Sequence, residues 1–454
     1  MHKQKDRKIS AAVIALGIVA VIAVTAAATA VTYAHFGGFG TGECADTEEF
    51  SKYAVAVSDI TVPDGAQIIA LGEVTHGNRE FQQLRLDVFR VLSEKYGVRA
   101  FALEGDFGGC EAIDRYIHGG DGTADEKSIG GIRAAGDGTA AEALSATGFA
   151  IYRTDEMESL AEWMRSYNAS AAEGEDIRFY GFDMEQHAYS YRYLLEELKK
   201  ADIDTSGFEK IWDGEKNAYS DLYTSAERAE TIRAIMEKMP ANESKARHYA
   251  DVLLQNIELG KYINDVGELN EQRDRMMAEN TLWIAELEQA RGNIRIMISG
   301  HNNHIMQCPN SGTPVLGSLL AERLGSGYFA IGTDFYKSVC NLPKPYTGER
   351  IAHTFYSRDP LAKASKKCGF DVSFLDLSIV PEDSPLAEHI ANNIPMGSVG
   401  EAYSFLMNII PRSYRVMRTP QNAYDAVIFV ADATPITIEP ISAGGRFDQT
   451  ETLR

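Results

Sequence analysis

Short apolar runs with strand character alternate with longer helical patterns from about residue 66 to the end of the chain. The strand candidates are Gln67–Leu71, Arg99–Leu103, Ile177–Phe182, Ile294–Ile298, Tyr328–Gly332, Asp371–Leu375 and Ala426–Val430. After the first of them, Phe81, Leu84 and Val88 recur at helical spacing, and Gly97 stands where that helix should end. Apolar strands separated by helices form mostly parallel sheets that are covered on both faces. The sequence therefore predicts an α/β fold with a mostly parallel central sheet flanked by helices.

The segment from Gln186 to about Ala290 departs from this alternation. It is long, rich in charge and helical in pattern, with Leu194, Leu195 and Leu198 on one stripe. We expect it to be a helical insertion over the carboxyl edge of the sheet, inside one α/β domain of residues 51–454.

Polar side chains follow the strand candidates with unusual regularity. Each of five residues lies within four positions of the end of such a run: Glu73, Glu104, Asp183, His301 and Asp334. If the sheet is parallel, these residues converge on its carboxyl edge, where open α/β sheets bind ligands. Acidic residues also cap the helices that follow strands, and this alternative stays open for Asp183 and Asp334.

Two of these strand ends combine Glu with His. They read Leu71-Gly-Glu-Val-Thr-His76-Gly and Ser299-Gly-His301-Asn-Asn-His304, so three of the chain's ten histidines stand in two loops. Imidazole and carboxylate groups together transfer protons near neutral pH. This arrangement is more typical of an enzyme than of a binding module.

The N-terminus predicts a membrane anchor. A basic flank, residues 1–10, precedes an uncharged run over residues 11–33 that is long enough to cross a hydrocarbon core of about 30 Å. Positive flanks stay in the cytoplasm, so the domain should lie outside. The small residues at 28–30 would suit a signal peptidase and give a secreted protein, but signal peptides usually have shorter apolar runs, of about 7–15 residues. We expect an uncleaved anchor followed by a Gly-rich tether, residues 34–50.

Charge and cysteine content exclude several classes of partner and site. The formal charge of −21 makes nucleic acid a poor partner and favours neutral or cationic small molecules. The five cysteines allow at most two disulfides, whose pairing the sequence does not reveal, and none has the spacing of a zinc ribbon. We expect a monomer that acts on a small molecule.

Several motifs in order make the chain similar to the erythromycin esterase family. They are residues 71–77, Phe101-Ala-Leu-Glu104, Arg115-Tyr116, residues 163–168, Phe179-Tyr-Gly-Phe-Asp183, Arg273-Asp274, residues 277–280 and His301-Asn-Asn-His304. The resemblance runs from about residue 66 to 335. It implies a hydrolase that needs no metal or cofactor, with His76 as general base. It further implies that the substrate is surrounded by Glu73, Arg85, Glu104, His301 and His304.

The resemblance leaves the substrate open. Macrolide ring opening, which confers antibiotic resistance, belongs to only some members of the family. The family usually has a Trp-Ala pair before its His-Asn motif, whereas this chain has Ser299-Gly300 and therefore lacks a bulky aromatic wall there.

The residues themselves point to hydrolysis by activated water. The chain has no Gly-x-Ser-x-Gly elbow and no Cys after a strand beside a His, so water activated by a His is the simplest route to ester or lactone hydrolysis. We expect Glu73 and Glu104 to orient His76. We expect His301 and Arg85 to stabilise the oxyanion, and Arg85 could alternatively fix Glu73 or Glu104 as an ion-pair partner. His304 and Asp183 should bind substrate.

Two other functions remain open. Glu73-x-x-His76 and His301-x-x-His304 resemble pairs of metal ligands, so the same residues could serve a metal-dependent hydrolase. In di-iron bundles, however, such pairs stand on helices rather than in loops. An exported protein that keeps the fold and only binds a ligand is the second alternative.

Overall fold

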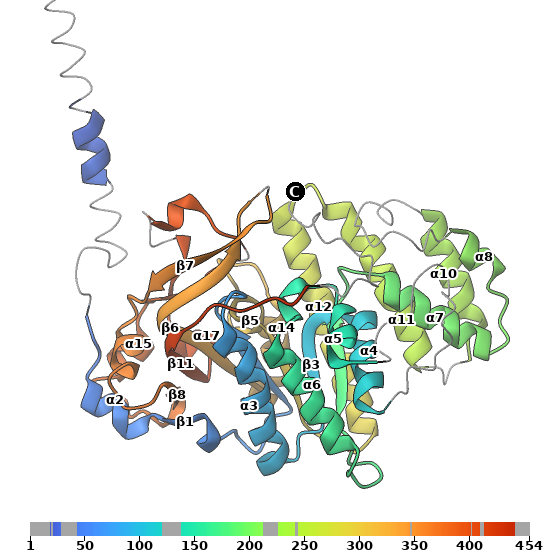
Figure 1. Ribbon diagram of the computed structural model, residues 1–454, viewed down its shortest axis with the longest axis horizontal. Coiled ribbons are helices and arrows are strands. Elements are labelled where there is room, and N and C mark those ends of the chain that lie inside the picture. Colours follow the sequence, from blue (N-terminus) through green and yellow to red (C-terminus); the bar gives the residue numbers. More distant parts are fainter. Residues whose placement is uncertain are drawn as a thin grey trace, which may run out of the picture.

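The computed structural model describes residues 19, 21–28, 43–119, 138–211, 226–240, 244–345, 347–400, 402–408 and 413–440. One sheet of nine strands forms its centre (Figure 1). The strands are β1 (Val55–Ala56), β2 (Ile68–Glu73), β3 (Ala100–Asp106), β4 (Arg178–Asp183), β5 (Ile296–His301), β6 (Tyr328–Pro343), β7 (Arg350–Tyr356), β8 (Val372–Asp376) and β11 (Ala426–Ala433). A separate pair joins β9 (Ile394–Gly397) to β10 (Arg415–Arg418).

The central sheet is mostly parallel. Its order is β1-β8-β11-β6-β2-β5-β3-β4, with β7 paired to the far end of β6. The strands from β11 to β4 run parallel to their neighbours, whereas β8, β1 and β7 pair antiparallel at the margins. The predicted fold class is confirmed, and each predicted strand is present within two residues at its start.

Helices cover both faces of this sheet. They are α2 (Thr47–Tyr53), α3 (Arg79–Tyr96), α4 (Phe107–Ile117), α5 (Ala140–Ser145), α6 (Asp155–Asn168), α7 (Ala188–Lys200), α8 (Ser206–Ile211), α10 (Ala226–Lys238), α11 (Ser244–Leu259), α12 (Val266–Ala290), α13 (Asn302–Ile305), α14 (Leu316–Leu324), α15 (Pro360–Ser365), α16 (Ala387–Ala391) and α17 (Pro420–Ala423). Successive residues of β2 enter opposite cores: Ile68 and Ala70 pack in one, Ile69 and Leu71 in the other. This explains why the strands are continuously apolar.

The end of α3 shows how the sequence sets a helix boundary. Gly97 follows Tyr96 with φ 68° and donates its N–H to the carbonyl of Leu92. A residue without a Cβ adopts this left-handed conformation at little cost, so the helix stops where the sequence predicted.

The elements described between β4 and β5 are all helices. They include α7, α8, α10 and α11, which Figure 1 shows beyond the β4 edge, and then α12, which returns toward the sheet. Helix α12 packs on both β4 and β5. The insertion thereby brings α12 to the carboxyl edge of the sheet.

The predicted membrane anchor is corrected by the structure. In the described part of the chain, no helix is both long and apolar enough to cross a membrane. Within residues 11–33 the structure describes helix at 19 and 21–28. The remainder of this run, the flank 1–10 and tether residues 34–42 lie outside the described residues, and the end of the expected tether enters α2.

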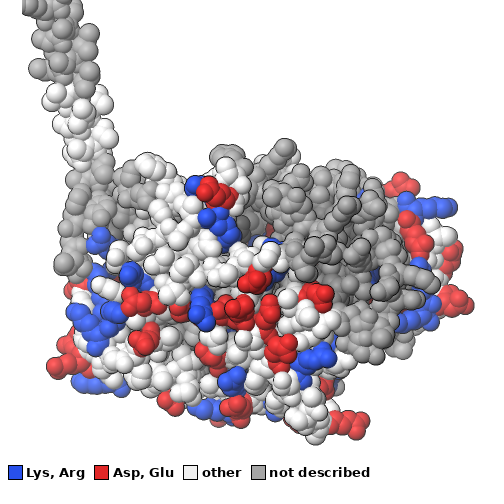
Figure 2. Space-filling view, in the orientation of Figure 1, with Lys and Arg blue, Asp and Glu red and all other residues white. Residues whose placement is uncertain are grey.

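Two surface features complete the description. All five cysteines are free thiols, so no disulfide contributes to stability. On the face in Figure 2, acidic and basic side chains are interspersed over the lower part, and the described residues form no continuous basic patch there.

Candidate active site

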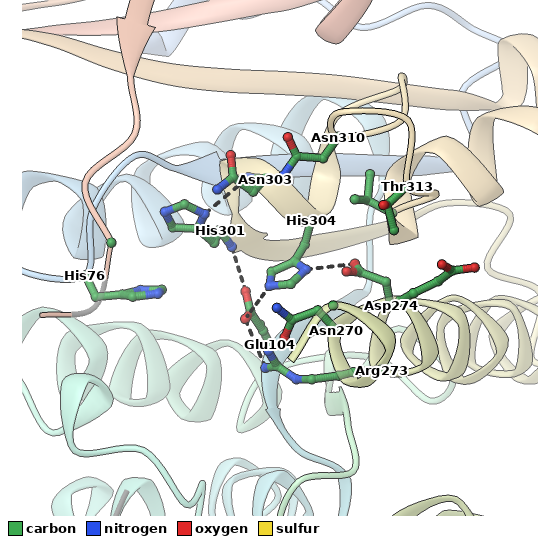
Figure 3. A pocket seen from close by; sticks show the side chains of 14 residues that line it. His76, Glu104, Asn270, Arg273, Asp274, His301, Asn303, His304, Asn310 and Thr313 are labelled. Carbon is green, nitrogen blue, oxygen red and sulfur yellow. Dashed lines mark hydrogen bonds and ion pairs between the residues drawn. The ribbon is translucent and has the colours of Figure 1, made fainter. Parts of the chain in front are cut away.

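The carboxyl ends of four adjacent strands bring the predicted polar residues together. In the order β2-β5-β3-β4, these strands supply Glu73, His301, Glu104 and Asp183. A cavity of about 350 Å³ opens at this edge (Figure 3). Its described lining includes His76, Glu104, His301 and His304, but not Glu73, Arg85 or Asp183.

His76 follows β2 and is held by the last residue of that strand. Its Nδ1 lies 3.3 Å from Oε2 of Glu73. A carboxylate accepts hydrogen bonds and donates none, so the neutral ring carries its proton on Nδ1 and Nε2 becomes the basic nitrogen. Figure 3 shows the ring extending from its loop toward the cavity. The pair can therefore present a base to a bound water.

Arg85 fixes Glu73 from behind the cavity. Its Nη2 lies 2.5 Å from Oε2 of Glu73, its Nη1 bonds to the side chain of Gln82, and its Nε donates to Oγ of Ser299 at 3.0 Å. Burial alone would raise the pKa of Glu73, but the Arg85 guanidinium and His76 hold it below its usual value. Of the two expected roles of Arg85, its contacts fit that of fixing Glu73, and Arg85 is not part of the described cavity lining. Arg85 is fully buried, and its side chain lies against Glu73.

Glu104, near the carboxyl end of β3, is a buried, ionised carboxylate. Its Oε2 accepts the backbone N–H of His301 at 2.6 Å, and its Oε1 lies 3.2 Å from Nη2 of Arg273. Burial opposes ionisation, but His304 and Arg273 outweigh it and lower the pKa of Glu104 to about 2. Glu104 therefore carries a fixed negative charge, and its nearest described partners are His301, Arg273 and His304 rather than His76.

His304 is a cation between two carboxylates. Its Nδ1 lies 2.7 Å from Oδ1 of Asp274, and its Nε2 lies 3.4 Å from Oε1 of Glu104. Burial disfavours the charged ring, but Asp274 and Glu104 raise the pKa of His304 to about 9. Because both nitrogens face carboxylates, His304 supplies positive charge to the cavity rather than a donor from a neutral ring.

His301 is the neutral histidine of the site. Its Nδ1 accepts the backbone N–H of Asn303 at 3.2 Å, which places the ring proton on Nε2. Burial and the proximity of His76 lower the pKa of His301 to about 3. Its Nε2 is buried and has no hydrogen-bond partner in the described part of the chain, although a buried donor normally has one. This atom is available to a ligand oxygen.

Asp183 contacts the site through Arg273. It is fully buried, and its Oδ2 lies 2.5 Å from Nη2 of Arg273. Its Oδ1 accepts the backbone N–H of Met184 at 2.7 Å. Asp183 thus holds Arg273, which lines the cavity. Asp183 itself was expected to bind substrate, but it is not part of the described lining.

Sequence reasoning missed the contribution of α12. Arg273 and Asp274 both line the cavity, and each holds an expected site residue, Glu104 and His304 respectively. Both residues lie in the interior of a helix, where no motif or strand end indicates a site. In the sequence they were noted only as part of the family resemblance.

The described residues contain no group of three or more His, Cys, Asp or Glu side chains placed to hold a metal ion. Nδ1 of His301 is bonded to the N–H of Asn303, and Nδ1 of His304 is bonded to the carboxylate of Asp274.

Comparison with known proteins places the chain in one family. The erythromycin esterase family profile matches residues 93–433. Erythromycin esterase type II of Escherichia coli is 26% identical over 387 residues, which cover 73% of this chain and 85% of that protein. The resemblance seen in the sequence is confirmed.

Solved structures share the fold. A succinoglycan biosynthesis protein has a TM-score of 0.69 at 17% identity, covering 87% of this chain and 98% of its own. A Bacillus cereus protein has a TM-score of 0.68 at 20% identity, with 87% and 100% covered. The erythromycin esterase EreC in its open conformation has a TM-score of 0.51 at 17% identity, with 83% and 93% covered.

Proposed function

The chain belongs to the erythromycin esterase family, and from this premise we propose that it hydrolyses a carboxylic ester or a macrocyclic lactone with water deprotonated by His76. Family membership supports a hydrolase. One observation carries the finer proposal: a single cavity contains an oriented base, His76, and a buried donor, Nε2 of His301, that has no partner among the residues the structure describes.

His76 acts as the base in this mechanism. Glu73 keeps the proton on Nδ1, so Nε2 accepts a proton from water as the oxygen attacks the carbonyl carbon. The resulting imidazolium is stabilised by the Glu73 carboxylate. Arg85 has a positioning role, since it holds Glu73 and does not line the cavity.

His301 receives the developing oxyanion. Its Nε2–H has no acceptor among the described residues, so a carbonyl oxygen gains this bond without displacing one of theirs. The charges of His304 and Arg273 lie along the same cavity and favour negative charge on the substrate. Collapse of the tetrahedral intermediate breaks the carbon–oxygen bond of the ester, and the His76 imidazolium returns its proton to the departing alkoxide. The products are a carboxylic acid and an alcohol, or a hydroxy acid from a lactone.

A panel of esters, with erythromycin included, tests the reaction. Hydrolysis in oxygen-18 water should place the label in the acid during the first turnover, because water attacks the substrate directly. Label in an enzyme carboxylate would instead indicate a covalent intermediate. Failure to hydrolyse any ester would favour a protein that only binds its ligand.

A further inference from the structure

One wall of the cavity takes no part in the proposed chemistry. Gly267, Asn270 and Glu271 line it from the first turns of α12. Their spacing of three and four residues puts them on the same helix face as Asp274. Figure 3 shows Asn270 rising from this helix while His301 comes from the opposite, sheet-side element. A substrate that contacts His301 therefore has a second group facing α12.

The carboxylate of Glu271 is the charged group of this wall. Its ion pair among the described residues is with Arg275, at 3.2 Å, and the two side chains are 30% and 46% exposed respectively. Exposed pairs at this helix spacing are weak because water competes for both partners. The charge of Glu271 is consequently available to a ligand, unlike that of Asp274, which is taken up by His304 and the backbone N–H of Leu316.

The described lining of the cavity carries one more carboxylate than cation. Its carboxylates are Glu104, Glu271 and Asp274, and its cations are Arg273 and His304. Glu104 and Asp274 contact these two cations, so Glu271 is the excess negative charge of the described lining. A local excess of one sign of charge concentrates ligands of the other sign.

The lining is polar and the space is small. The outer part presents the side chains of Asn270, Asn303, Asn310 and Thr313, and Val315 is the one branched aliphatic residue in the described lining. Small-molecule sites usually have mainly apolar walls and volumes of about 300–1,000 Å³. A cavity of about 350 Å³ with amide and hydroxyl walls fits a compact, hydrophilic molecule.

We propose that the substrate is a compact, hydrophilic ester bearing a cationic amine, and that Glu271 is the specificity residue that binds the ammonium group. The acyl oxygen faces Nε2 of His301, and the charged end faces α12. This inference rests on the proposed ester hydrolysis.

Two esters of nearly the same shape test it with the full-length protein. Acetylcholine carries a quaternary ammonium group, and 3,3-dimethylbutyl acetate replaces that group with an uncharged one. Wild type should hydrolyse acetylcholine with a kcat/KM about tenfold higher. Glu271→Gln should remove this preference through KM, with kcat nearly unchanged. Glu279→Gln, an exposed substitution on the same helix outside the cavity lining, should keep the preference.

Calorimetric binding of choline separates this inference from the reaction itself. Choline should bind wild type and Glu279→Gln, and bind Glu271→Gln at least fivefold more weakly. Equal hydrolysis of both esters, with no preference altered by Glu271→Gln, would overturn the inference while leaving ester hydrolysis intact. Choline binding that depends on Glu271, without hydrolysis of either ester, would support the ammonium site and count against the reaction. Neither binding nor hydrolysis would reject both.

Discussion

The rings of His76 and His301 lie with their centroids 5.2 Å apart, although one follows β2 and the other ends β5. The parallel pairing of these strands aligns Glu73 with His301 and so creates the contact. Two histidines that differ in their hydrogen-bond partners, a carboxylate for one and a backbone N–H for the other, can take different roles within one cavity.

Removal of the proposed base should abolish most of the activity. His76→Ala is expected to lower kcat about 10²–10⁴-fold, the usual contribution of general-base catalysis, while the thermal midpoint changes little. Steady-state kinetics and a melting curve check both expectations. His389→Ala, on α16 and outside the cavity lining, serves as the matched control. Undiminished kcat in His76→Ala would remove His76 from the mechanism.

The Arg85–Glu73 pair should be coupled in stability. Arg85→Ala leaves Glu73 as a buried carboxylate without its guanidinium, so the free energy of unfolding should fall by about 3–5 kcal/mol. Adding Glu73→Gln should restore part of that loss, because a neutral amide costs less to bury. Urea titration of the two single variants and the double variant measures the coupling. Purely additive effects would show that the pair is not coupled.

Stability should depend on pH through His304. Asp274 and Glu104 raise its pKa from an unfolded value near 6.5 to about 9, although burial opposes this. The folded protein thus binds the proton more tightly, and the stabilisation is complete below about pH 6.5 and lost as pH rises to about 9. The difference in unfolding free energy between wild type and His304→Gln should shrink across this window. A difference that is flat from pH 6 to 9 would contradict the cationic assignment.

The opposite dependence is expected for Glu104. His304 and Arg273 lower its pKa to about 2 against the effect of burial, so its stabilisation is present above about pH 4.5 and is lost as pH falls toward 2. Acid unfolding of wild type compared with Glu104→Gln measures this contribution. Parallel curves below pH 4.5 would refute it.

Removal of metal ions should leave hydrolysis unchanged. The proposed base is activated by Glu73 rather than by a metal, so excess EDTA followed by gel filtration should preserve kcat. Loss of activity that returns on adding zinc would support the metal-dependent alternative instead.

The sheet could be predicted because its central strands are buried on both faces. β2, β3 and β5 contain only buried residues and read as continuous apolar runs. β7 lies at the margin with alternating exposure, and β9 is only four residues long, so neither gave a recognisable signal. Strand ends were misjudged where pairing continues. β6 runs on to Pro343, which puts Asp334 inside the strand, where it pairs with Arg415 of β10.

The site was predictable only as far as it follows strand ends. Glu73, Glu104 and His301 could be identified because parallel strands bring their carboxyl ends to one edge. The partners Arg273 and Asp274 depend on how α12 packs over that edge, which no local pattern reveals. The sequence offered Arg85 both as a substrate contact and as a partner of Glu73, and it could not decide between them, because the choice depends on buried bonds of Arg85 to Glu73 and Ser299.

The lack of a Cβ at Gly300 leaves the space that the carboxylate of Glu104 occupies. A Cβ built on this residue would lie 2.8 Å from Oε2 of Glu104, the oxygen that accepts the N–H of His301. The acid thus occupies the volume that an alanine methyl group would need. An alanine at position 300, as in a Trp-Ala pair, would therefore require the Glu104 carboxylate to shift from its bond with the N–H of His301. Engineering an aromatic wall into this cavity requires first finding another position for the carboxylate.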